Sequence, residues 1–130
     1  MPDAVKEAFR AAKTGDAARV REMVEGDGTL LEARDAEGAT LLHYAAWKGH
    51  AEVAAALLEL GAAVDAQSHN THWGGTPLHA AAHANQRRVA EILLQPGADP
   101  RAVSGNGRTP LEETALHNAT AVAKLLRAAA

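Results

Sequence analysis

A short phrase recurs three times in this chain of 130 residues and constrains its fold more than any other feature. The copies are GATLLH at residues 38–43, GGTPLH at residues 74–79 and GRTPLE at residues 107–112. Their threonines, Thr40, Thr76 and Thr109, lie 36 and 33 residues apart, a spacing typical of solenoids built from supersecondary repeats. An alanine-rich segment, a turn residue and an apolar helix pattern follow each copy, so the sequence predicts units of turn, helix, turn and helix.

The first helix of each unit has a defined start. A threonine hydroxyl can accept a hydrogen bond from an unpaired backbone N–H in the first turn, and Pro77 and Pro110 stand at the first helical position, where no N–H is needed. In the last unit, Thr109 and Glu112 have the spacing of a capping box. We therefore expect short helices to begin directly after Thr40, Thr76 and Thr109.

Helices this short cannot bury their apolar faces alone. Stability must come from stacking between neighbouring units, and the two end units need a more polar outward face. Charged residues near both ends fit this requirement: Lys6, Glu7 and Arg10 at one end, and Glu112, Glu113, Lys124 and Arg127 at the other.

The repeated unit resembles the ankyrin repeat. The motif Thr-Pro-Leu-His-x-Ala-Ala at residues 76–82 is followed by Val-x-x-x-Leu-Leu at residues 89–94 and Gly-Ala-Asp at residues 97–99. Residues 11–16 parallel residues 45–50, so the N-terminal segment is similar to a degenerate first repeat. The resemblance covers nearly the whole chain.

The resemblance implies an all-α fold, an ankyrin-repeat solenoid of about four helix-turn-helix units joined by β-hairpin-like loops. A single domain over residues 1–130 is expected. Its units are residues 3–34 as the N-terminal cap, 35–67, 68–103, and 104–130 as the C-terminal cap.

Two connections depart from the family pattern. Residues 66–75 form a longer connection than the one before Thr109, which predicts an enlarged hairpin finger. Residues 26–31 extend the first connection, predicted as a polar turn followed by an apolar contact with the stack. Insertions in repeat proteins map to loops on one face, so the 66–75 loop is either a functional addition or tolerated drift.

Composition excludes several functional classes. A net charge of −3 with a pI near 6.1 gives no cationic surface for nucleic acid. The chain has no cysteine, which removes disulfides, thiolate metal sites and cysteine nucleophiles. No export signal or membrane-length apolar segment is present, so we expect a cytoplasmic monomer without membrane contact.

Ankyrin repeats bind other proteins through their concave side, made of hairpin tips and first helices. The resemblance implies that the family's variable positions, which flank the threonine and follow the alanine pair, contact the partner. Including Tyr44, one turn before Lys48, the expected partner-binding residues are Glu37, Tyr44, Trp47, Lys48, His72, Trp73, His83, Asn106, Arg108, Leu116 and His117.

Both tryptophans of the chain fall within this set. A tryptophan ring is costly to leave in water and is a typical interface anchor, so Trp47 and Trp73 favour a protein partner. Local packing of either ring against the neighbouring finger is the alternative.

The histidines raise the possibility of a metal site. His43 and His79 occupy the histidine of the family phrase, and the resemblance implies that they hydrogen-bond loop backbone within the stack. His69, His72 and His83 lie close together in sequence and could hold a metal ion. We expect neither a metal nor another cofactor there, because His79, which is paired with His83 at helical i, i+4 spacing, is engaged within the stack, and no carboxylate or cysteine completes the set.

No nucleophile elbow, phosphate loop or zinc-protease motif is present, so the chain is not expected to be an enzyme. The sequence favours a protein-protein interaction module: an adaptor, an inhibitor or a regulatory subunit. The alternative is a protein that binds a metal or small ligand in the His69–His83 region.

Overall fold

A computed structural model describes residues 3–70 and 74–129 of the chain. Within these ranges the protein is helical, with eight α-helices and one short 3₁₀-helix. The elements are α1 (Asp3–Thr14), α2 (Ala17–Gly26), η1 (Gly28–Glu32), α3 (Leu41–Lys48), α4 (Ala51–Glu59), α5 (Pro77–His83), α6 (Arg87–Leu94), α7 (Pro110–Leu116) and α8 (Thr120–Ala129).

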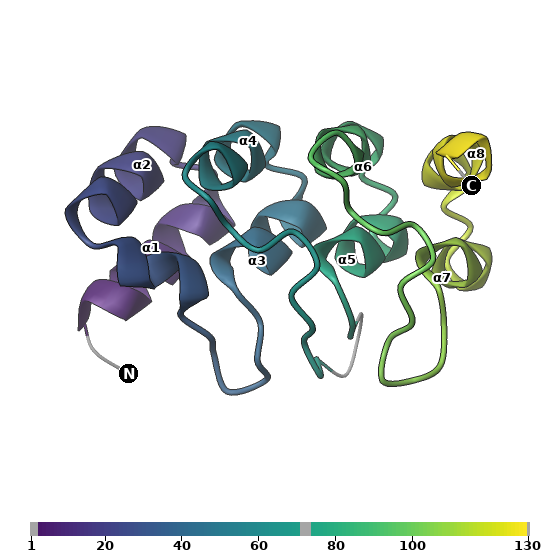
Figure 1. Ribbon diagram of the computed structural model, residues 1–130, viewed down its shortest axis with the longest axis horizontal. Helices are drawn as coiled ribbons and strands as arrows, with labels where there is room; N and C mark the ends of the chain where they lie inside the picture. Colours follow the sequence, from purple (N-terminus) through teal and green to yellow (C-terminus); the bar gives the residue numbers. More distant parts are fainter. Residues whose placement is uncertain (1–2, 71–73, 130) are drawn as a thin grey trace.

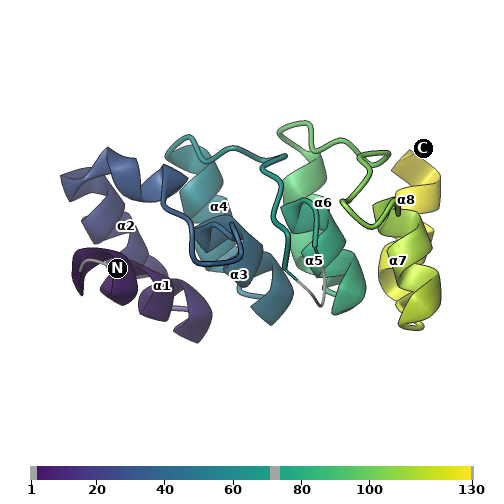
Figure 2. The same cartoon turned by 90° about the horizontal axis from the view of Figure 1, so that it is seen from below.

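The helices form two parallel rows along one axis (Figure 1). The inner row contains α1, α3, α5 and α7, and the outer row contains α2, α4, α6 and α8. Each helix packs against its neighbours in the same row and against its partner in the other row. The termini lie at opposite ends, and the long loops project together from one side (Figures 1 and 2). This arrangement confirms the predicted all-α solenoid of four helix pairs.

Capping boxes start three of the inner helices. The hydroxyls of Thr40, Thr76 and Thr109 each accept a hydrogen bond from the backbone N–H three residues later. The predicted Thr109–Glu112 box is confirmed, because a Glu112 carboxylate oxygen accepts from the Thr109 N–H at 3.0 Å. In the other two units the imidazoles of His43 and His79 take the place of the carboxylate.

The same two histidines also connect successive units. Nδ1 of His43 accepts from the Thr40 N–H, which leaves the proton on Nε2 to donate to the Gly75 carbonyl at 2.8 Å. His79 makes the equivalent bond to the Arg108 carbonyl at 2.7 Å. The structural role that the resemblance implied for both histidines is confirmed. Burial lowers the pKa of His43 to about 4, so its ring is neutral at physiological pH.

The core lies between the two rows and between neighbouring units. The alanine pairs of α3 and α5 have no exposed surface, which lets adjacent inner helices approach closely. Leu57 of α4 and Leu93 of α6 are also fully buried. The turns between rows need a left-handed residue, supplied by Gly49 with φ of 76° and by Asn85 and Asn118 with φ of 56°.

The first extended connection folds as predicted. Asp27 caps η1 by accepting from the Thr29 N–H at 3.1 Å, and Leu30 is buried with 3% of its surface exposed. The segment is therefore a polar turn followed by an apolar contact with the stack.

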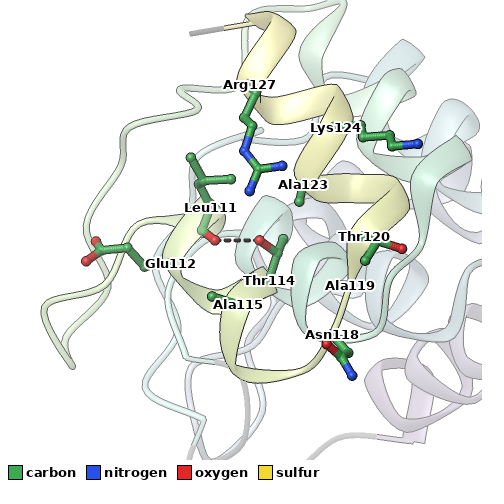
Figure 3. A pocket seen from close by; sticks show the side chains of 10 residues that line it. All are labelled: Leu111, Glu112, Thr114, Ala115, Asn118, Ala119, Thr120, Ala123, Lys124 and Arg127. Atoms are coloured by element: carbon green, nitrogen blue, oxygen red, sulfur yellow. Dashed lines mark hydrogen bonds between the residues drawn. The ribbon is translucent and has the colours of Figure 1, made fainter.

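The outward face of the last unit carries an open groove between α7 and α8 (Figure 3). Glu112, Lys124 and Arg127 line it together with Leu111, Ala115 and Ala123, so this outer face combines charged and apolar side chains. The prediction for Glu113 is wrong: this side chain is 2% exposed and turns toward α5. Successive residues of a helix are rotated by about 100° about its axis, so the adjacent side chains of Glu112 and Glu113 point to different faces. None of the helices described combines the length and hydropathy needed to cross a membrane.

Candidate functional site

The expected partner-binding residues fall on the inner row and on the loops before it. Trp47 and Lys48 end α3, while Leu116 and His117 lie at the end of α7. His83 is the last residue of α5. The loop residues in the set are Glu37, Asn106 and Arg108. His72 and Trp73 lie outside the described residues.

Aromatic rings form a row across α1 and α3. The centroids of Phe9 and Tyr44 are 5.7 Å apart and those of Tyr44 and Trp47 are 6.4 Å apart, both in edge-to-face geometry. The Lys13 ammonium lies 4.5 Å from the Tyr44 centroid, and the Lys48 ammonium lies 4.7 Å from the Trp47 centroid. The row therefore combines large apolar rings with two cations that are attracted to them.

Members of this row differ in exposure. Trp47 is half-buried, whereas Tyr44 is only 8% exposed and donates its hydroxyl to Asp35. Burial, followed by this hydrogen bond, raises the pKa of Tyr44 well above its ordinary value. Burial also raises the pKa of Asp35, but hydrogen bonds from Tyr44 and from backbone N–H groups outweigh it and hold that pKa below its usual range. Tyr44 thus lies beneath the surface on which we expected it.

Sequence reasoning did not identify Phe9 as part of this aromatic row. Aligning the alanine pair of α1, Ala11 and Ala12, with that of α3 places Phe9 at the position of His43 in the repeat phrase. That register could have shown that Phe9 faces the next unit, where its ring meets Tyr44.

A groove of about 400 Å³ adjoins the aromatic row on α1. Phe9, only 4% exposed, lies at its floor, and the side chains of Lys6, Arg10 and Lys13 also line it. Asp35 is its acidic member. The groove thus offers an apolar patch with an excess of positive charge.

Hydrogen bonds hold neighbouring loops together. The Glu37 carbonyl accepts from the Ser68 hydroxyl at 3.1 Å and from the His69 N–H at 2.9 Å, and the Asn70 amide donates to the Glu37 carboxylate at 3.1 Å. Ser68 and Gly75 form an isolated antiparallel bridge at the base of the 66–75 finger. The bases of these loops are therefore fixed relative to the helices.

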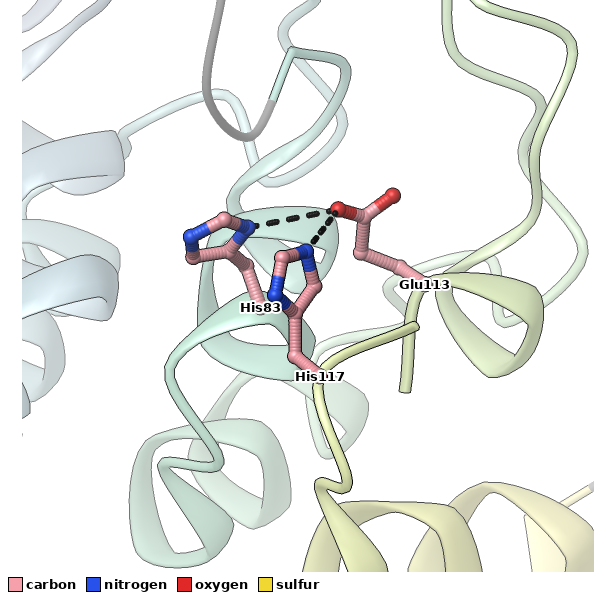
Figure 4. Close-up of side chains that lie close together, drawn as sticks. All are labelled: His83, Glu113 and His117. Atoms are coloured by element: carbon pink, nitrogen blue, oxygen red, sulfur yellow. Dashed lines mark hydrogen bonds and ion pairs between the residues drawn. The ribbon is translucent and has the colours of Figure 1, made fainter. Parts of the chain in front are cut away.

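A polar cluster joins α5 to α7. Nδ1 of His83 lies 3.3 Å from Oε1 of Glu113, and Nε2 of His117 lies 3.2 Å from the same oxygen (Figure 4). Arg108 donates to the other carboxylate oxygen at 3.0 Å. Burial raises the pKa of Glu113, but the hydrogen bonds from Arg108 and His83 outweigh this and lower it below its usual value. The carboxylate is thus ionised at neutral pH.

This cluster corrects the histidine set considered from the sequence. We expected no carboxylate beside His69, His72 and His83, yet Glu113 adjoins His83 although it lies 30 residues away in sequence. Among the described residues, the group of three potential metal ligands is His83, Glu113 and His117, and His69 is not part of it. His69 lies in the finger, against Gly38.

Comparison with known proteins identifies the family of this chain. The chain matches a family model described as ankyrin repeats (three copies) over residues 8–68 and 60–130. It is 40% identical to the serine/threonine-protein kinase VIK of Arabidopsis thaliana over 86 residues, which are 66% of this chain and 19% of the kinase.

Two further relatives are named as other kinds of protein. The palmitoyltransferase Hip14 of Drosophila melanogaster is 37% identical over 98 residues, 75% of this chain and 15% of the relative. The BTB/POZ domain and ankyrin repeat-containing protein NPR5 of Oryza sativa subsp. japonica is 38% identical over 103 residues, 79% of this chain and 19% of the relative. The chain spans only 15% to 19% of these relatives. With the repeat phrases, the stacked helix pairs and the family match in agreement, the chain belongs to the ankyrin-repeat family.

Proposed function

We propose that this protein is a protein-protein interaction module, acting as an adaptor, an inhibitor or a regulatory subunit. The partner contacts the inner row of helices and the tips of the loops before it. The observation that carries this proposal is the aromatic row of Phe9, Tyr44 and Trp47 with Lys13 and Lys48 above two of its rings.

The chemistry of this row supports a protein ligand. Half-exposed tryptophans are frequent anchors of interfaces because burying the rest of the ring removes apolar surface from water. Phe9 and Tyr44, 4% and 8% exposed, lie beneath this surface, and the Tyr44 ring packs against the Trp47 ring. The adjoining groove on α1 adds Lys6 and Arg10. A partner segment with an apolar side chain beside acidic residues fits both features.

The remaining proposed contacts extend this surface along the solenoid. Leu116 is 60% exposed at the end of α7, and Asn106 is exposed at a loop tip beside His69 and Asn70. His72 and Trp73 belong to the proposal on the basis of sequence alone. The relatives include a kinase, a palmitoyltransferase and a BTB/POZ protein, so the family does not specify the partner.

Affinity capture from a lysate of the source cells tests this function. The wild type is compared with the double variant Trp47→Ala, Trp73→Ala, and captured proteins are identified by mass spectrometry. We expect a protein that the wild type retains and the double variant loses. The matched control is Arg87→Ala, Arg88→Ala on α6, which removes two exposed side chains from the outer row and should retain the same protein.

Circular dichroism of each variant shows whether the fold is intact. Equal capture by the wild type and a folded tryptophan variant would contradict the proposed surface. Loss of capture only in the arginine variant would place the partner on the outer row instead.

A further inference from the structure

The cluster of His83, Glu113 and His117 has the composition of a metal site. Imidazole nitrogens and a carboxylate oxygen are common zinc ligands, and two histidines with one glutamate form a known three-ligand set. The three donor atoms lie within 4.8 Å of one another. The donors come from two units, since His83 ends α5 while Glu113 and His117 lie one helical turn apart at α7.

Two of the donor spacings match the edges of a tetrahedron. Zinc bonds of about 2.0 to 2.1 Å place neighbouring tetrahedral ligands about 3.3 to 3.4 Å apart. The Glu113 Oε1 atom lies 3.3 Å from Nδ1 of His83 and 3.2 Å from Nε2 of His117. The two imidazole nitrogens lie within 4.8 Å of each other, and side-chain rotation would bring all three atoms to bonding distance of one ion.

Arg108 supports the carboxylate from the other side. Its Nε donates to Oε2 of Glu113 at 3.0 Å, which fixes the carboxylate and leaves Oε1 directed at the two imidazoles (Figure 4). Hydrogen bonds of this kind commonly orient metal ligands. Glu113 itself is 2% exposed, so the site has a buried anion at its base, and the 37% exposed His117 side chain leaves a path from solvent.

We propose that His83, Glu113 and His117 bind one zinc ion, with water completing the coordination. Binding would link the third and fourth helix pairs through a shared ligand set. The ion would replace the hydrogen bond between His83 and Glu113 and the contact between His117 and Glu113. Because the donors come from α5 and α7, zinc stabilises the folded chain by binding the native state more tightly than the unfolded state.

Isothermal titration of the metal-free, untagged protein with Zn²⁺ tests this proposal. We expect one ion per chain, a rise in melting temperature with zinc, and binding weakened more than about 10-fold in His83→Ala and in His117→Ala. His69→Ala is the matched control, because His69 is an exposed histidine outside the cluster, and its affinity should equal that of the wild type.

X-ray absorption of the zinc-loaded protein gives a second readout, with four nitrogen or oxygen ligands expected at about 2.0 to 2.1 Å. Circular dichroism checks the fold of each variant; His117 is exposed, so its variant should fold normally. Absence of zinc binding by the wild type would overturn the proposal. Unchanged binding in a folded His83→Ala, His117→Ala double variant would also overturn it, as would an equal loss in His69→Ala.

Discussion

At the scale of single residues, the histidine of the repeat phrase does two tasks. In the second unit, Nδ1 of His43 caps its own helix while Nε2 donates to the Gly75 carbonyl in the next unit. In the fourth helix pair, Glu112 caps its own helix by accepting from the Thr109 N–H. The histidine thus joins a helix start to the neighbouring unit, whereas the glutamate caps a helix start.

Buried histidine makes the stability of the fold depend on pH. Burial lowers the folded-state pKa of His43 to about 4, so the unfolded chain binds a proton at a higher pH than the native chain. The stabilisation linked to the neutral His43 ring is fully present above about pH 6.5 and is lost as the pH falls toward 4. Over this range the free energy of unfolding decreases by up to about 1.4 kcal/mol per pH unit. His79, whose pKa is also lowered by burial, acts in the same direction.

Urea unfolding between pH 7.5 and 4.5 measures this effect. The free energy of unfolding should fall over that range, and His43→Gln should reduce the slope, because glutamine can cap the helix without titrating. A free energy of unfolding that is independent of pH over the range, or an unchanged slope in the variant, would disprove the role of His43.

At the scale of elements, the turns between the two rows depend on left-handed residues. Gly49 ends α3 with φ of 76°, and a Cβ at this position would collide with the Gln86 side chain of the next unit. Asn118 occupies the equivalent place in the last unit with φ of 56°. Asparagine tolerates this conformation better than other residues with a Cβ, and glycine adopts it without strain.

Gly49→Ala should therefore destabilise the protein by about 1 to 2 kcal/mol from backbone strain, with a further cost for displacing Gln86. Asn118→Gly is the control, expected to change the free energy of unfolding by less than about 0.5 kcal/mol. Chemical denaturation of both variants provides the measurement. Equal stability of Gly49→Ala and the wild type would show that the turn does not need its left-handed geometry.

Much of the fold could be predicted because the phrase has local physical meaning. Thr40, Thr76 and Thr109 fix helix starts through bonds that span only three residues. The orientation of Glu113 could not be predicted, because its partner His83 reaches it only through the stacking of α5 on α7.

The aromatic row was missed in part for the same reason. Trp47 was identified from the repeat position that it occupies, but Phe9 belongs to the degenerate first unit and meets Tyr44 only across the boundary between units.

At the scale of the whole molecule, stability depends on contacts between neighbouring helix pairs. Leu93 of α6 is fully buried, so Leu93→Asp places an unpaired charge in the core and should cost several kcal/mol, enough to unfold the stack. Leu116→Asp introduces the same charge at a 60% exposed leucine and should leave the fold unchanged. Thermal unfolding followed by circular dichroism compares the two. An unchanged melting temperature for Leu93→Asp would contradict the stacking account.

The central claim is that the inner row is the face that binds a protein partner. Site-specific photo-crosslinking tests it most directly, with a photoreactive amino acid placed at Lys48 on α3 or at Glu91 on α6, both exposed. In a lysate of the source cells, the Lys48 position should crosslink to a defined protein that the Glu91 position does not reach. Crosslinking of that protein mainly from Glu91, or no crosslink from Lys48, would contradict the claim.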